Sequence, residues 1–264
     1  MKNELNHTFV ICAYKESPFL EECILSVLNQ TSSSRVLIAT STDTPLIREM
    51  SEKYGLELRY SGLASDIAGD WNYAYHQADT RYVTIAHQDD VYDPGYAETA
   101  VRMLDKKNRP LLFFSDYYEI RDGQAVYRNL NLRIKKIMLA PLLIPGLSGR
   151  KAVKRSVLAL GNPICCPSVT YVRDNLPYSL FRKGMKSNID WQAWAAASGM
   201  CGDFVYKNKP LMGHRIHVGS TTTEIIESSS RTQEDLFMLK QFWPDPIAER
   251  INRLYQNAEK SNKS

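Results

Sequence analysis

Two adjacent carboxylates, Asp89 and Asp90, closely follow a run of apolar and β-branched residues at positions 82–86. This run predicts a buried strand, and paired carboxylates at the end of such a strand are costly unless something holds them. Hard oxygen ligands suit Mg²⁺ or Mn²⁺, and ligands of open α/β sheets lie just past the carboxyl ends of strands. The pair therefore predicts a divalent-cation site. The alternative is that one of the two residues only caps a turn before Pro94.

The elements that must position this pair alternate between strand and helix patterns. Apolar runs that predict strands occupy residues 8–13, 36–39, 56–60, 82–86 and 111–115. Apolar residues at helical spacing predict helices that begin at Ser17 and Pro18, at Pro45, at Gly69, and at Asp93 and Pro94. This order predicts parallel βαβ units with right-handed crossovers, and Asp122 with Gly123 predicts the turn of a hairpin that follows them.

A basic segment separates the first half of the chain from the second. Residues 129–155 include seven basic residues and no acidic one, around an apolar stretch at residues 137–147. Two interpretations remain open: a helical excursion that packs on the domain, or a surface patch that faces an anionic acceptor or a membrane interface. Farther on, residues 168–172 predict a strand, residues 190–197 a helix, and the residues after Arg231 an amphipathic tail.

Length and composition limit the class of protein. A chain of 264 residues with 44% hydrophobic residues can bury one large core, and no apolar run is long enough to span a bilayer. The formal charge of +4 is too small to indicate nucleic acid as a partner. Five cysteines, with no secretory signal before Thr8, predict reduced thiols in a cytoplasmic compartment.

Several motifs resemble the family 2 glycosyltransferases, which have the GT-A fold. VICAYKESPFLEECILSVLNQT is similar to the family's first strand, loop and helix, and Ser41-Thr42-Asp43 to the end of its second-strand motif. YVTIAHQDDVYDPGY is similar to the strand, metal motif and following helix, and Asn188-Ile189-Asp190-Trp191 to the segment with the catalytic base. The resemblance spans about the first 115 residues closely and becomes patchier to about residue 220.

The resemblance implies a Rossmann-like α/β fold with a mostly parallel central sheet flanked by helices. Residues 1–220 would form the GT-A domain, with a nucleotide-binding half at 1–115 and an acceptor-side half at 116–220. Residues 221–264 would form a C-terminal helical extension. Such a domain implies an inverting transfer of one sugar from a nucleotide diphosphate donor, in the first instance a UDP-sugar. The acceptor would be a glycan or lipid-linked glycan of bacterial surface polysaccharide, met in the cytoplasm or at the inner face of the membrane.

The resemblance also implies the roles of individual residues. Asp89 would ligate Mn²⁺ or Mg²⁺ and Asp190 would be the general base. The nucleotide would contact Ala13, Tyr14, Glu16, Asp43, Asn72, Gln88 and Arg215. Arg215 belongs to HRIHVGSTTT, which is similar to the late loop of this fold, and His217 in the same loop would complete the metal shell. Each residue also has a simpler interpretation, such as a helix N-cap for Asp190 and an Asx turn for Asp43.

The chain departs from the family pattern at three positions near these residues. His87 occupies the first place of the family's Asp-x-Asp-Asp motif, and Trp71 replaces the arginine of its Ala-Arg-Asn motif. Ile189 stands where the family has Glu before the base. These changes leave open a catalytically weak protein that only binds nucleotide sugars. A nucleotidyltransferase is the remaining alternative, although it would need a Gly-rich phosphate loop and YKESPF is not one.

Overall fold

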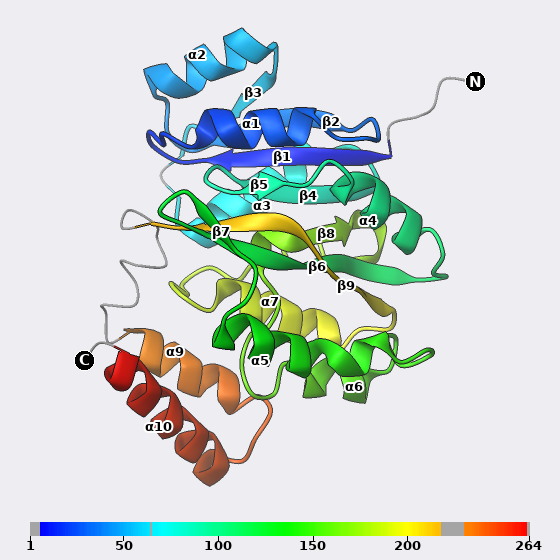
Figure 1. Cartoon of the computed structure of the whole chain (residues 1–264), viewed down its shortest axis with the longest axis vertical. Helices are drawn as coiled ribbons and strands as arrows, with labels where there is room; N and C mark the ends of the chain where they lie inside the picture. Colours follow the sequence, from blue (N-terminus) through cyan, green and yellow to red (C-terminus); the bar gives the residue numbers. More distant parts are fainter. Residues whose placement is uncertain (1–5, 64, 218–229, 263–264) are drawn as a thin grey trace.

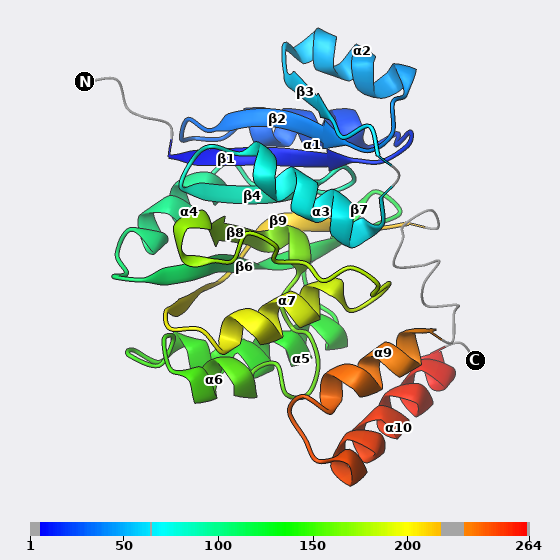
Figure 2. The same ribbon diagram turned by 180° about the vertical axis from the view of Figure 1, so that it is seen from behind.

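A single mixed sheet runs through the middle of the molecule, with helices on both of its faces (Figures 1 and 2). The computed structural model describes residues 6–63, 65–217 and 230–262. Within these residues the strand order is β3-β2-β1-β4-β8-β6-β9-β5, and β7 pairs with β6. The strands are β1 (His7–Ala13), β2 (Arg35–Thr40), β3 (Glu57–Tyr60), β4 (Tyr82–His87), β5 (Val91–Tyr92), β6 (Pro110–Arg121), β7 (Gln124–Val126), β8 (Val169–Val172) and β9 (Asp203–Ile216).

The first four long strands form the parallel half of the sheet, as the alternating pattern predicts. β1 pairs in parallel with both β2 and β4, and β2 pairs in parallel with β3. The helices of the described chain are α1 (Leu20–Leu28), α2 (Pro45–Tyr54), α3 (Ile67–Gln77), α4 (Tyr96–Leu104), α5 (Leu130–Leu139), α6 (Lys151–Ser156), α7 (Ile189–Ser198), α9 (Ser230–Leu239) and α10 (Asp245–Asn262). Short 3₁₀ turns include η1 (Ala140–Leu143) and η2 (Cys166–Ser168).

Helix starts differ from the sequence expectation by a few residues. Ser17 and Pro18 form a turn before α1 rather than its first residues. α3 begins before Gly69 because the side chain of Asp66 caps it, accepting a hydrogen bond from the Gly69 N–H at 2.7 Å. α4 begins later than Pro94, because the chain first forms the short strand β5 and a turn.

Strand β9 is the main element that the sequence did not reveal. It pairs in parallel with β6 and antiparallel with β5, and register shifts interrupt its pairing with β6. Pro210 and Gly213 lie within it and obscure the alternation of a strand. The prediction of a loop at 214–223 is therefore wrong for residues 214–216, which belong to β9. Residues 218–223 lie outside the described part of the chain, and so does the proposed domain boundary at 220/221.

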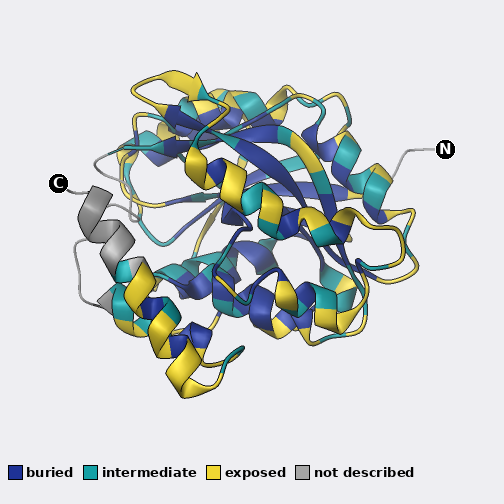
Figure 3. Ribbon diagram, turned by 60° about the horizontal axis from the view of Figure 1, so that its bottom comes forward, coloured by how far each residue is buried: buried dark blue, intermediate teal, exposed yellow. Residues whose placement is uncertain are grey.

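Two hydrophobic cores lie on opposite faces of the sheet. α1 and α4 cover one face (Figure 1), with α1 contributing Cys23 and Ile24 to the core there. α3 and α7 cover the other (Figure 2), where Trp191 and Trp194 are buried rather than available to an acceptor sugar. Figure 3 shows the strands as mostly buried and the outer sides of the helices as exposed. None of the described helices combines the length and apolar character needed to cross a membrane.

Candidate functional site

The two carboxylates lie just past the carboxyl end of β4 and have different surroundings. Asp90 is fully buried, and its Oδ1 accepts a hydrogen bond from the Arg215 N–H at 2.8 Å and lies 3.0 Å from Nδ1 of His214. Asp89 is partly exposed, and its Oδ2 lies 3.0 Å from Nε2 of His217. Asp90 therefore joins β4 to β9, and Asp89 remains accessible beside an imidazole.

Asp89 and His217 fit a divalent cation that takes its other ligands from a substrate. In the described part of the chain no three His, Cys, Asp or Glu side chains are gathered to hold a metal ion by themselves. A cation such as Mg²⁺ commonly takes only one or two protein carboxylates and completes its shell with phosphate oxygens and water. Oδ2 of Asp90 is buried and makes no hydrogen bond within the described residues, so the pair retains further capacity for a cation.

A reciprocal pair of hydrogen bonds joins the ends of β1 and β4. The Tyr14 N–H donates to Oε1 of Gln88 at 3.0 Å, and Nε2 of Gln88 donates to the Tyr14 carbonyl at 2.9 Å. Ala13 is buried at the end of β1, whereas Tyr14 and Glu16 are exposed. Between them Lys15 has a positive φ of 54°, and its N–H donates to Oγ1 of Thr42 at 2.6 Å. These contacts shape an open loop beside Asp89, as nucleotide binding requires, although the contacts with a nucleotide stay predictions.

Asp43 and Asn72 already have partners in this structure. The Asp43 carboxylate forms a two-point ion pair with Arg48, whose hydrogen bonds and charge lower the pKa of Asp43. The Asn72 amide is buried, donates to the Phe181 carbonyl at 2.6 Å and accepts from the N–H groups of Leu180 and Phe181 at 3.1 Å. Asn72 thus fixes the segment at 180–181, and a direct nucleotide contact by either residue stays a prediction.

Arg215 lies behind the carboxylate pair and is almost fully buried. Its guanidinium donates to Oε2 of Glu22 at 2.5 Å and to the Asp89 carbonyl at 2.9 Å, and it stacks on the Phe19 ring at 4.3 Å. Phe19 also meets the His217 ring edge to face, with centroids 5.1 Å apart. Arg215 therefore braces the backbone of Asp89. Its predicted contact with a diphosphate would require it to share its charge with Glu22.

The two unusual residues of the family pattern contact one another. The rings of Trp71 and His87 stack with centroids 5.1 Å apart, and Trp71 meets Phe181 edge to face. Burial lowers the pKa of His87 despite the nearby charges of Asp90 and Asp89. His87 is consequently neutral at physiological pH and does not replace the charge of the missing arginine.

Asp190 is half-buried in the first turn of α7. Its Oδ2 accepts a hydrogen bond from Nδ2 of Asn162 at 2.7 Å, and its Oδ1 accepts one from the Trp191 N–H at 2.7 Å. Asn188, not Asp190, is the N-cap of this helix. Burial raises the pKa of Asp190 to about 6, which the hydrogen bonds and the charge of Lys135 only partly oppose. A carboxylate with such a pKa is suited to accept a proton near neutral pH.

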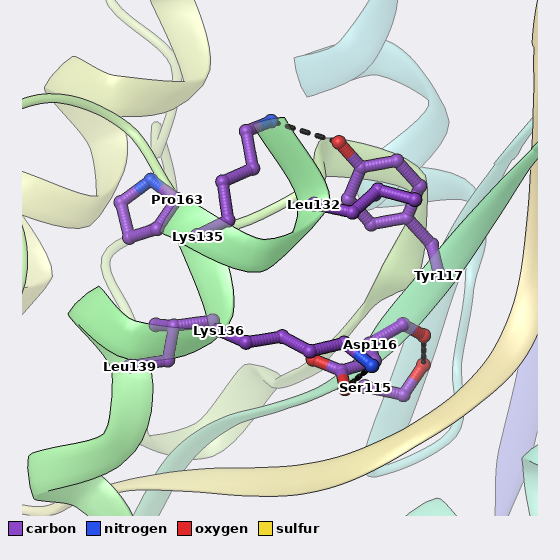
Figure 4. A pocket seen from close by; sticks show the side chains of 8 residues that line it. All are labelled: Ser115, Asp116, Tyr117, Leu132, Lys135, Lys136, Leu139 and Pro163. Carbon is purple, nitrogen blue, oxygen red and sulfur yellow. Dashed lines mark hydrogen bonds and ion pairs between the residues drawn. The ribbon is translucent and has the colours of Figure 1, made fainter. Parts of the chain in front are cut away.

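A lysine from α5, Lys135, is near both Asp190 and His214. Nζ of Lys135 donates to the hydroxyl of Tyr117 at 2.9 Å (Figure 4). Its charge acts on Asp190 and also on His214, so it lies within electrostatic range of both. The neighbouring Lys136 pairs with Asp116 at 3.0 Å, and the small pocket between them measures about 10 Å³, room for roughly one water.

The structure joins the predicted residues into groups that the sequence keeps apart. Asp89, Arg215 and His217 are in direct contact across more than 120 residues of chain, and Tyr14 contacts Gln88. The contact partners that sequence reasoning missed include Glu22, Tyr117, Lys135 and Asn162. Lys135 lies in the basic segment, and this is the one sequence feature that could have pointed to it. The other three residues stand in no distinguishing pattern.

A mixed α/β sheet with carboxylates at a strand end, helices on both faces and a helical C-terminal region is the architecture of GT-A glycosyltransferases. The sequence model of Glycosyl transferase family 2 matches residues 8–167, more than half of the chain, and the chain belongs to this family. The predicted fold and family are thereby confirmed.

Two solved structures illustrate the likeness in fold. The structure of S. aureus TarS 1-349 in complex with UDP-GlcNAc superposes with a TM-score of 0.63 at 15% identity, over 97% of this chain and 73% of that one. The mannosyltransferase PcManGT from Pyrobaculum calidifontis, in complex with GDP-Man and Mn²⁺, gives a TM-score of 0.59 at 15% identity, over 97% and 75%. A search of the curated proteins found no match.

Proposed function

We propose that this family member is an inverting glycosyltransferase that moves one sugar from a nucleotide diphosphate donor, a UDP-sugar, to a glycan acceptor. The observation that supports it best is the contrast between two carboxylates. Asp89 is accessible and lies beside an imidazole, whereas Asp190 is half-buried with a pKa of about 6. Ligation of a cation and acceptance of a proton are different tasks, and they need carboxylates in different environments.

The donor would bind in the half formed by residues 1–115. The exposed loop around Tyr14 and Glu16 would contact the base and ribose, with Gln88 close to the ribose. Asp43 would accept a hydrogen bond from the imide of uracil while it keeps part of its contact with Arg48. The UDP-GlcNAc bound to TarS supports a uridine nucleotide, although GDP-Man in the mannosyltransferase leaves guanine as the alternative.

In the reaction, Asp89 and His217 would hold Mn²⁺ or Mg²⁺ together with the donor diphosphate. When bound, such an ion supplies Lewis-acid stabilisation of the charge that develops on the leaving diphosphate. Asp190, with Asn162 fixing its Oδ2, would take the proton of the acceptor hydroxyl as that oxygen attacks the anomeric carbon. Attack from the face opposite the diphosphate inverts the anomeric centre and needs no nucleophile from the enzyme.

The acceptor is proposed to be a glycan, lipid-linked at the inner face of the cell membrane, in bacterial surface polysaccharide synthesis. The basic–apolar face supports peripheral contact of this kind; it consists of Leu130, Arg133, Ile134, Ile137, Leu143, Ile144, Arg150 and Lys151, all exposed. Apolar side chains with flanking cations are suited to an anionic lipid interface. Lys154 is not part of this face, because it is fully buried and donates to the carbonyls of Met200 and Gly202.

Calorimetry of UDP binding with Mn²⁺ and with chelator tests the donor side of the proposal. UDP should bind much more tightly with Mn²⁺, and Asp89→Asn should remove the difference. Asp122→Asn, at an exposed hairpin turn, is the matched control. Equal affinity with and without the metal in the unmodified protein would refute the metal role.

The alternative, a protein that binds nucleotide sugars with little catalysis, is favoured by the neutral His87–Trp71 stack. Turnover of a UDP-sugar with Mn²⁺ separates the two functions. Binding without turnover would leave only the alternative.

A further inference from the structure

The C-terminal helix α9 contacts the residues that lead directly into α7. The carboxylate of Glu234 accepts hydrogen bonds from the N–H groups of Lys186, Ser187 and Asn188, at 2.7, 2.8 and 3.0 Å. The Ser187 hydroxyl donates a fourth, at 2.7 Å. One carboxylate on α9 therefore satisfies three successive backbone donors that an open chain would leave to water.

The contacts from α9 matter for the start of α7 because the N-cap side chain of this helix does not cap it. Asn188 is the N-cap residue, yet its side chain makes no capping hydrogen bond to the helix. Its Nδ2 instead donates to Oδ1 of Asp235 at 2.7 Å. The backbone that sets the direction of the first turn, where Asp190 lies, is thus held from α9.

Helix α9 is itself firmly attached to the domain. Met238 and Leu239 are fully buried in the core that includes Trp191. Beyond the helix, the Gln241 carbonyl accepts a hydrogen bond from Arg155 at 2.6 Å, and Nε1 of Trp243 donates to the Ala159 carbonyl at 2.7 Å. Figure 2 shows α9 and α10 beside the lower end of the domain, below α7. A carboxylate on such a helix is a fixed anchor.

Glu234 is ionised at neutral pH, and its hydrogen bonds are with residues 186–188 rather than with Asp190. Burial works toward a higher pKa, but the hydrogen bonds from the segment at 186–188 outweigh it and lower the pKa of Glu234. The largest causes of the raised pKa of Asp190 are its own burial, opposed by Trp191, Lys135 and Asn162. The contacts of Glu234 are with the backbone that leads to Asp190, so its influence is expected to be geometric.

We propose that Glu234 is a positioning residue that holds residues 186–188 so that Asp190 faces the acceptor. This inference rests on the proposed role of Asp190 as the base. It makes the C-terminal helices part of the catalytic unit rather than an appended extension. A base misplaced by a small distance loses much of its effect, because proton transfer depends on alignment.

The test compares Glu234→Gln and Glu234→Asp with Glu249→Gln, a substitution of an exposed glutamate on α10. Hydrogen exchange of the amides of residues 186–188 should become about tenfold faster in Glu234→Gln, because a charged acceptor is lost. Glu234→Asp should recover part of the protection, since it keeps the carboxylate, and Glu249→Gln should resemble the unmodified protein. Unchanged exchange at 186–188 in Glu234→Gln would overturn the inference.

The functional half of the test uses the UDP-sugar with the largest Mn²⁺-dependent thermal shift. In Glu234→Gln, kcat should fall about tenfold, while UDP affinity with Mn²⁺ stays unchanged. The pH at which the transfer rate reaches half of its maximum should also stay unchanged. Faster exchange with normal turnover would refute a positioning role, as would an equal loss of UDP affinity. Normal turnover by Asp190→Asn would instead remove the proposed base itself, so the two failures are distinguishable.

Discussion

Replacing Asp190 with Asn separates the proposed base from a merely structural residue. Asn keeps the shape of the side chain and leaves the N-cap at Asn188 untouched, but its one oxygen can accept from only one of the two donors that the carboxylate serves, Asn162 and the Trp191 N–H. The substitution removes the negative charge, the ability to take a proton and one accepted hydrogen bond. Its effects on stability and on transfer should therefore have opposite signs.

The effect on stability follows from the raised pKa. The pKa of Asp190 is about 6 in the folded protein, against an ordinary value of 3.8. Each pKa unit corresponds to about 1.4 kcal/mol, so the ionised carboxylate costs the folded state about 3 kcal/mol. Because the folded state retains the proton between pH 3.8 and 6, stability falls as pH rises through this window and stays lower above it.

The assay combines urea unfolding from pH 4 to pH 8 with steady-state transfer. Asp190→Asn should be about 1 kcal/mol less stable than the unmodified protein at pH 4, because one hydrogen bond is lost, and should exceed it by about 2 kcal/mol at pH 7 and above. Transfer at pH 7 should fall by roughly 10²- to 10⁴-fold, the usual contribution of a general base, while UDP affinity persists. In the unmodified protein, transfer should rise with pH through about 6.

Two results would refute this reasoning. Near-normal transfer by Asp190→Asn would show that the carboxylate is not the base. A loss of stability at pH 8 would show that the charged form is stabilised by its surroundings, contrary to the raised pKa. The exposed Asp122→Asn serves as the control for a change of one charge and should alter neither property.

Three further variants test the proposed metal site, the basic–apolar face and the sheet. His217→Gln should weaken UDP binding with Mn²⁺ but not with chelator, and an equal loss in both would exclude a metal ligand. Arg133→Gln combined with Lys151→Gln should reduce binding to vesicles of anionic lipid at low salt. If the unmodified protein does not bind them at all, the basic–apolar face has no membrane role. Gly213→Ala should destabilise by about 1–3 kcal/mol in urea unfolding, since a Cβ there would lie 2.6 Å from the Tyr118 ring. Unchanged stability would show that the Tyr118 ring on β6 can move aside without cost.

The parallel half of the sheet could be predicted because its signals are local. Each strand is a short apolar run, and each helix repeats apolar residues every three or four positions, so neighbours in sequence are neighbours in space. β9 is different, since its 14 residues are stabilised by pairing with β6, about 90 residues earlier, and with β5. No pattern within the β9 sequence indicates that it pairs with β6, and Pro210 and Gly213 suggest a loop.

The site shows the same division between local and distant signals. Asp89 follows a recognisable strand, so its place past the carboxyl end of β4 was predictable from the sequence. Its neighbour His217 was named through the family resemblance alone. Asn162 and Glu234 act through side chains that look like ordinary surface polar residues in the sequence, and only the fold shows what they contact.

The charges around Asp89 provide an independent argument for a divalent ion in the proposed reaction. Asp89, Asp90 and Glu22 bring three negative charges to the end of β4, and Arg215 offsets one of them. The carboxylates of Asp90 and Asp89 outweigh burial and raise the pKa of His214, which offsets a second charge only while it is protonated. His87 stays neutral because burial lowers its pKa, so the arginine replaced by Trp71 has no substitute there. A region that remains negative repels a diphosphate, and a divalent cation that arrives with the donor neutralises this charge. We therefore expect metal-dependent UDP binding even if Asp190 proves not to be the base.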